Sequence, residues 1–146
     1  MNNLEIFSNK ADNYKRYRPP YSDEAINFLF DNSILDPTDT VADIGSGTGL
    51  FASQIIGRVQ SIYGVEPNEQ MRNAAQNAFI NEPKYIPVNG TAENTQLSSE
   101  SVDAVSAAQA FHWFDPIRFR NECKRILKPN GPVILANSAK TACRFR

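Results

Sequence analysis

The stretch TVADIGSGTG, residues 40–49, decides the fold of this chain. Its first half, Thr40–Ile44, is a short β-prone run, and glycine then occupies positions 45, 47 and 49. Residues 50–58 carry apolar side chains at helical spacing, so the glycines stand where a strand leads into a helix. Glycine lets a backbone approach a ligand closely, and the free N–H groups of a helix start favour an anionic or acceptor-rich group. The stretch therefore predicts a strand, a ligand-binding loop and a helix, although three glycines can also simply shape a turn.

The same alternation of strand and helix extends over the rest of the chain. Further strands are predicted over residues 61–66, 84–88, 102–108 and 132–136, and further helices over 22–31, 71–79 and 117–127. Strands that alternate with helices imply a parallel sheet with helices on both faces. The predicted fold is α/β, a doubly wound, Rossmann-like, mostly parallel sheet of five strands, with its ligand at the carboxyl ends of the strands.

Composition excludes several classes of partner. With 146 residues and 41% hydrophobic content the chain is the size of one globular domain, and 15 basic against 16 acidic residues leave no strong field for nucleic acid or an anionic membrane. Cys123 and Cys143 match no metal spacing and no disulfide framework, which is typical of free thiols in a reducing compartment. No segment approaches the length of a membrane span. We expect a soluble cytoplasmic protein with no metal, nucleic-acid or membrane partner.

Glu66 narrows the choice of ligand. A dinucleotide fingerprint requires glycine or alanine where the chain has Leu50, and the Gly-Lys-Ser/Thr of a phosphate-binding P-loop is absent. Glu66 ends the second predicted strand 21 residues after Gly45, where a carboxylate can accept both hydroxyls of a ribose. The pattern favours an adenosine-type ligand. Alternatively, Glu66 is a helix-start charge near Asn68 and Glu69.

These residues carry a resemblance to a known family. The segments DIGSGTG (43–49), GVEPN (64–68) and GTAE (90–93) resemble the successive ligand-binding motifs of class I S-adenosylmethionine-dependent methyltransferases. Residues 7–21, 101–115 and 125–131 are similar to the small-molecule branch of that family, which includes trans-aconitate methyltransferase-like and methyltransferase type 11 proteins. The resemblance covers nearly the whole chain.

The resemblance implies S-adenosylmethionine as the cofactor and methyl transfer to a small molecule. It implies that the Gly45–Gly49 loop wraps the methionine part, that Glu66 holds the ribose and that Met71 lies against the adenine face. It also implies that residues 90–93 read the adenine edge, with Thr91 where the family usually has an acidic residue. The implied cofactor-binding residues are Asp43, which orders the loop, and Gly45, Ser46, Gly47, Thr48, Gly49, Glu66, Met71, Thr91, Ala92, Glu93 and Gln109.

Candidate acceptor-side residues come from two other segments. His112, the only histidine, follows the fourth predicted strand and is either a catalytic base or, together with Trp113, part of the substrate wall. Methyl transfer to a carboxylate would need no base. Tyr14 and Arg18 either close over the cofactor and an acidic substrate or belong to a solvated terminus.

The chain is divided by these patterns into an N-terminal arm, residues 1–20, and a methyltransferase core, residues 21–146. Residues 137–146 lack the apolar alternation of two further strands, so the core is expected to lack the family's C-terminal antiparallel hairpin and to be truncated. Val133–Ala136 would then be an exposed edge that could pair in a homodimer. Two other functions stay open: a cofactor-binding module without catalysis, and a nicotinamide-dependent oxidoreductase, which Leu50 disfavours.

Overall fold

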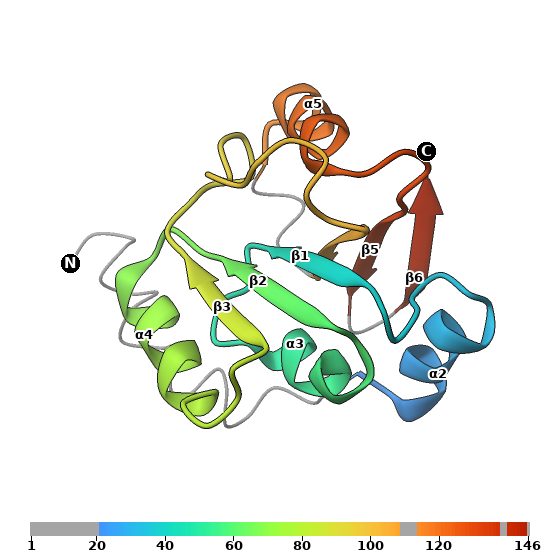
Figure 1. Cartoon of the computed structure of the whole chain (residues 1–146), viewed down its shortest axis with the longest axis horizontal. Helices are drawn as coiled ribbons and strands as arrows, with labels where there is room; N and C mark the ends of the chain where they lie inside the picture. Colours follow the sequence, from blue (N-terminus) through green and yellow to red (C-terminus); the bar gives the residue numbers. More distant parts are fainter. Residues whose placement is uncertain (1–20, 109–113, 138–139, 146) are drawn as a thin grey trace.

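The computed structural model describes residues 21–108, 114–137 and 140–145. These residues form an α/β domain (Figure 1). None of the helices in the described ranges combines the length and apolarity that a bilayer crossing requires. The elements in chain order are α2 (Asp23–Asp31), β1 (Thr40–Ile44), α3 (Leu50–Ile55), the 3₁₀ turn η1 (Ile56–Arg58), β2 (Ser61–Val65), α4 (Glu69–Ala78), β3 (Tyr85–Val88), β4 (Ala104–Ala108), α5 (Pro116–Ile126), β5 (Val133–Asn137) and β6 (Lys140–Phe145).

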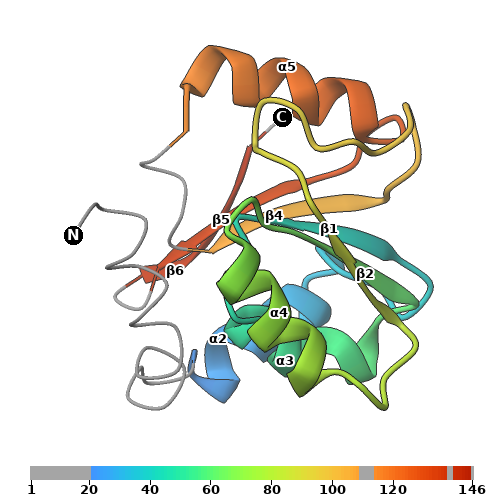
Figure 2. The same cartoon turned by 90° about the vertical axis from the view of Figure 1, so that its left-hand side faces the viewer.

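The strands form one sheet in the order β3-β2-β1-β4-β5-β6. The pairs among β1 to β5 are all parallel, and β6 is antiparallel to β5. Helices α2, α3 and α4 cover one face of the sheet and α5 covers the other (Figure 2). The prediction of a doubly wound, mostly parallel sheet is therefore confirmed.

Two apolar layers hold the helices against the sheet. Val41 and Ala42 are neighbours in β1, and their side chains point to opposite faces because successive residues of a strand alternate. Val41 belongs to the layer beneath α2, α3 and α4, together with Ile55, whereas Ala42 belongs to the layer beneath α5, together with Phe119. A strand covered on both faces needs apolar residues at nearly every position, which explains the continuous run in β1.

Three of the helices begin at side chains that cap their free N–H groups. Ser22 accepts a hydrogen bond from the N–H of Ala25, and Asn68 accepts one from the N–H of Met71. Asp115 accepts from two N–H groups at the start of α5, which has proline at its first position. The helix predicted over residues 117–127 is present and begins one residue earlier, at Pro116.

The expectation that β5 would be an exposed edge strand is wrong. Residues 140–145 form β6, which pairs with β5 in an antiparallel register that includes Val133 with Phe145 and Leu135 with Cys143. The sequence argument failed because it required apolar alternation, whereas an edge strand can be held by main-chain hydrogen bonds alone and needs only a short connection to an antiparallel neighbour. Pairing of two copies through β5 loses its basis.

Candidate functional site

The glycine loop, residues 45–49, lies at the carboxyl end of β1. Gly45, Gly47 and Gly49 have φ angles of 67°, 59° and 90°, in the left-handed region that side chains with a Cβ rarely adopt. Gly49 is also the N-cap of α3, so the loop turns the chain directly from strand to helix. The backbone conformation explains why glycine occupies these alternate positions.

Glu66 joins the glycine loop to the end of β2. Its Oε1 accepts a hydrogen bond from the N–H of Gly47, and its Oε2 accepts one from the N–H of Asn68, both at 2.9 Å. Burial raises the pKa of Glu66, and these two hydrogen bonds oppose that rise. The alternative interpretation of Glu66 as a helix-start charge describes one half of the arrangement, since Asn68 is the N-cap of α4. The other half is the contact with the loop.

Asp43 is buried beneath the loop, with 1% of its surface exposed. Its Oδ1 accepts a hydrogen bond from the hydroxyl of Ser106 at 2.9 Å, which links β1 to β4. Burial, together with the nearby charge of Glu66, raises the pKa of Asp43 to about 7, although the Ser106 bond acts in the opposite direction. Among the described residues, the Asp43 side chain is therefore hydrogen-bonded to β4 and not to the loop.

The loop leaves room at one position and a free polar group at the next. A Cβ built on Gly47 would meet no atom within 4 Å, whereas a Cβ on Gly49 would lie 2.6 Å from the ring of Phe79. The hydroxyl of Thr48 is buried and has no hydrogen-bond partner among the described residues. A buried hydroxyl without a partner is costly and calls for a ligand or water. The loop thus fits a ligand with polar groups that lies over Gly47.

The loop of residues 90–93 follows β3 in the connection to β4. Ala92 is buried in the apolar layer beneath α5, and Thr91 accepts a hydrogen bond from the N–H of Asn94 through its hydroxyl. Oε1 of Glu93 accepts a hydrogen bond from the N–H of Asp115 at 2.9 Å. The loop is therefore tied to the start of α5.

The remaining predicted residues fall into two groups. Ser46 is buried in the glycine loop, and Met71 is half-buried in the first turn of α4, just after Glu66 and Asn68. The others lie outside the described residues; they are Tyr14, Arg18, Gln109, His112 and Trp113. The structure thus brings together the predicted residues that follow β1 and β2, and it leaves the acceptor-side prediction untested.

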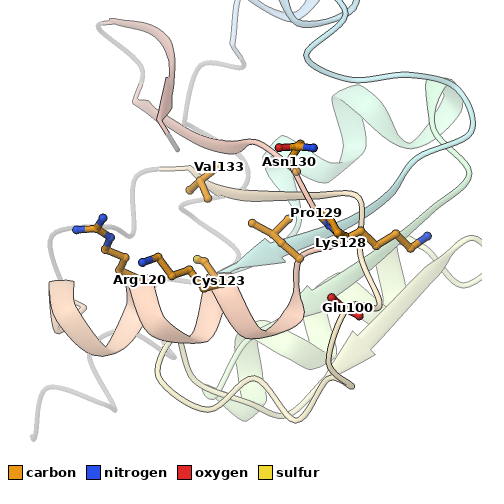
Figure 3. A pocket seen from close by; sticks show the side chains of 10 residues that line it. Glu100, Arg120, Cys123, Lys128, Pro129, Asn130 and Val133 are labelled. Carbon is orange, nitrogen blue, oxygen red and sulfur yellow. The ribbon is translucent and has the colours of Figure 1, made fainter.

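A separate cavity of about 320 Å³ lies between α5 and β5 (Figure 3). It is lined by Arg120, Cys123 and Lys124 of α5, by Val133, and by Glu100 and residues 127–131. No residue of the predicted cofactor set lines it. Cys123 is a buried free thiol, and burial raises its pKa to about 12, so it is not a reactive thiolate.

Sequence reasoning missed two buried polar residues that form hydrogen bonds between elements of the fold. Ser106 stands in the otherwise apolar run of β4, and Glu122 stands on the core-facing side of α5 between Phe119 and Ile126. In each case the signal was a polar residue at a position whose periodicity predicts an apolar one.

Comparison with known proteins identifies related chains. The sequence pattern of the methyltransferase-domain family matches residues 42–135. The chain is 36% identical over 125 residues to an uncharacterized methyltransferase of Mycobacterium tuberculosis, a match that covers 86% of this chain and 49% of that protein. It thus spans about half the length of the curated relatives it matches.

Solved structures share the fold. The YcgJ protein from Bacillus subtilis has 25% sequence identity and a TM-score of 0.70, over 78% of this chain and 50% of its own. A SAM-dependent methyltransferase from Aquifex aeolicus has 18% identity and a TM-score of 0.71, over 92% of this chain and 72% of its own.

Proposed function

Since the chain belongs to the methyltransferase-domain family of class I S-adenosylmethionine-dependent methyltransferases, we propose that it binds S-adenosylmethionine and transfers its methyl group to a small molecule. One observation carries the proposal: Glu66 and Gly47 are in direct contact, next to open space above Gly47. A carboxylate that binds the ribose and a loop that binds the methionine part of the cofactor would have to lie side by side in this way.

Glu66 has acceptor capacity left for a ribose. Each of its oxygens accepts one N–H, from Gly47 and from Asn68, and a carboxylate oxygen can accept a second hydrogen bond. The backbone bonds fix the carboxylate in place before a ligand arrives, so little rotamer freedom is lost when a diol binds. In this proposal the hydroxyl of Thr48 pairs with the methionine part, and Met71 lies against the adenine face.

The adenine edge and the acceptor complete the proposed site. Thr91, Ala92 and Glu93 follow β3 at the same edge of the sheet, and we assign them to the adenine edge. Gln109 is assigned to the sulfonium end of the cofactor. Tyr14, Arg18, His112 and Trp113 are assigned to the acceptor, with His112 as a base where the acceptor carries a proton to be removed.

The bound sulfonium would supply an electrophilic methyl group. The protein's part is to align the acceptor with that methyl group and to hold fixed dipoles and charges around it. The rigid connection between β1 and β2 through Glu66 serves this alignment, because both ends of the ligand would rest on the same carboxyl edge of the sheet.

Calorimetric titration with S-adenosylhomocysteine and with NADH tests the cofactor. We expect S-adenosylhomocysteine to bind and NADH to give no signal; the reverse result would overturn the proposal in favour of an oxidoreductase. A second assay incubates the chain with methyl-labelled S-adenosylmethionine and a low-molecular-mass extract. Label in a product of low mass supports methyl transfer, whereas cofactor binding without labelled product would indicate a binding module.

A further inference from the structure

Glu122 is an acidic residue on the core-facing side of α5. Its side chain is 8% exposed, and the neighbours on that side, Phe119 and Ile126, are buried. A carboxylate left unpaired at such a position is strongly destabilising. Its presence therefore requires specific partners.

Four hydrogen-bond donors surround this carboxylate. Thr95 donates to Oε2 through its backbone N–H at 2.8 Å and through its hydroxyl at 2.7 Å. Arg125 donates through Nε to Oε1 at 2.7 Å and through Nη2 to Oε2 at 2.8 Å. Burial acts to raise the pKa of Glu122, but the hydrogen bonds from Arg125 and Thr95 outweigh burial and lower this pKa to about 2. The carboxylate is therefore charged at neutral pH.

Glu122, Arg125 and Thr95 together form what we call the α5 clamp. Nη2 of Arg125 also donates to the carbonyl oxygen of Leu97 at 2.7 Å, and the N–H of Leu97 donates to the hydroxyl of Thr95. Thr95 is 1% exposed. The clamp therefore fixes the main chain of residues 95–97 against α5.

The loop proposed to read adenine rests directly on the clamped segment. A Cβ added to Gly90 would lie 2.5 Å from the carbonyl oxygen of Thr95, so the two backbones are in contact. The loop closes on itself because the N–H of Thr91 donates to the carbonyl oxygen of Asn94 at 2.9 Å. A shift of Thr95 would be transmitted to the loop because no side chain lies between them.

A second connection leads from the same loop to the same helix. Glu93 accepts a hydrogen bond from the N–H of Asp115, the N-cap of α5, about two turns before Glu122. The loop is thus held on α5 at both of its ends. The N–H of Ala92, which lies between these connections, has no hydrogen-bond acceptor among the described residues.

We propose that Glu122 is a positioning residue for the nucleobase of the cofactor: through Thr95 it places the loop of residues 90–93 so that this loop distinguishes adenine from hypoxanthine. The inference rests on the proposed function, which assigns the loop to the adenine edge. N1 of adenine is an acceptor that suits the free N–H of Ala92. Hypoxanthine carries a proton on N1 and would face that N–H donor to donor.

The test measures purine preference rather than affinity alone. The dissociation constants of S-adenosylhomocysteine and S-inosylhomocysteine, which differ only in the purine, are determined by calorimetry for the wild type and for Glu122→Gln. We expect Glu122→Gln to weaken S-adenosylhomocysteine about tenfold and S-inosylhomocysteine less than about twofold, because only adenine uses the positioned contact. The preference for adenine should fall accordingly.

Matched variants separate positioning from general damage. Glu100→Gln makes the same change at an exposed glutamate near the clamp and should leave both constants unchanged. Thr95→Val removes both hydrogen bonds of the Thr95 hydroxyl, the one it donates to Glu122 and the one it accepts from the N–H of Leu97. It keeps the Glu122–Arg125 ion pair and should lower the preference, whereas Thr95→Ser should retain it. Thr95→Val also serves as the decisive variant if Glu122→Gln does not fold.

The outcomes are distinguishable. An unchanged preference in a folded variant, or equal weakening of both ligands, would overturn the positioning role while leaving the proposed function intact. Failure of the wild type to bind S-adenosylhomocysteine would overturn the proposed function and this inference with it.

Discussion

The carboxylate of Glu66 accepts a hydrogen bond from the backbone N–H of Gly47, although the two residues are 19 positions apart in the chain. The contact spans the neighbouring strands β1 and β2 at their carboxyl ends. The hydrogen bond fixes the acid and the loop relative to each other. Such preorganisation reduces the entropy that a ligand must lose on binding.

Replacement of Glu66 tests the ribose assignment. We expect Glu66→Ala to weaken S-adenosylhomocysteine binding by about 2 kcal/mol, the scale of hydrogen bonds to a charged group. Calorimetric titration measures the change. Glu69→Ala, which removes an exposed acid from the first turn of α4, should leave the affinity unchanged. Equal affinity of Glu66→Ala and the wild type would contradict the assignment.

A substitution at Gly47 should affect ligand binding much more than the stability of the fold. Any other residue at this position would have to adopt a backbone φ of 59°, and its Cβ would project into space where no protein atom lies within 4 Å. We expect Gly47→Ala to cost about 1 kcal/mol in the free energy of unfolding, from the left-handed backbone, and to abolish binding of S-adenosylhomocysteine.

A second glycine provides the control for Gly47. A Cβ on Gly57 also meets nothing within 4 Å, but its backbone is not in the left-handed region, and it lies in η1 away from the loop. Gly57→Ala should therefore preserve both binding and stability. Retained binding in Gly47→Ala would mean that the loop is only a turn.

The sequence could predict the glycine loop, the parallel sheet and the position of Glu66 because these depend on local patterns. Residues 40–49 show a strand and a turn by composition alone, and parallel neighbours bring their carboxyl ends together. The contact between Glu66 and Gly47 follows from that arrangement once β1 and β2 are adjacent.

Tertiary features could not be predicted in the same way. Two of the four donors around Glu122 belong to Arg125, three residues later in the same helix, but the other two belong to Thr95, 27 positions away, and no periodicity encodes that meeting. The open space over Gly47 and the unpaired hydroxyl of Thr48 also depend on packing around the loop. Strand β6 was missed because main-chain pairing at a sheet edge places few demands on side chains.

Gly131 is required by close packing rather than by its backbone angles. A Cβ there would lie 2.7 Å from the carbonyl oxygen of Asp103 and 3.2 Å from that of Lys128. Neither backbone atom can rotate away, so Gly131→Ala should lower the free energy of unfolding by about 2 kcal/mol, the scale of overpacking. Urea unfolding measures the loss. The affinity for S-adenosylhomocysteine should not change, because Gly131 lines the cavity between α5 and β5 and not the proposed cofactor site. A stability equal to that of the wild type would show that the backbone around Gly131 shifts easily.

Asp43 should make stability depend on pH in a predictable direction. Its pKa in the folded protein is about 7 because of burial and the charge of Glu66, whereas an unfolded aspartate has 3.8. Between these values the unfolded chain has lost the proton that the folded protein keeps, so stability decreases as pH rises from about 4 to about 7 and is level above that. Asp43→Asn removes this titration.

Unfolding by urea at pH 5 and pH 8 tests this titration. The free energy of unfolding of Asp43→Asn, relative to the wild type, should rise by about 3 kcal/mol between the two pH values, since the wild type loses stability over the two units from pH 5 to its pKa of about 7 and each unit corresponds to about 1.4 kcal/mol. Asp36→Asn is the control: hydrogen bonds from Thr38 lower the pKa of Asp36, so this group is charged in both states throughout the range and the difference should stay constant. A constant difference for Asp43→Asn as well would show that Asp43 is already ionised in the folded protein at pH 5.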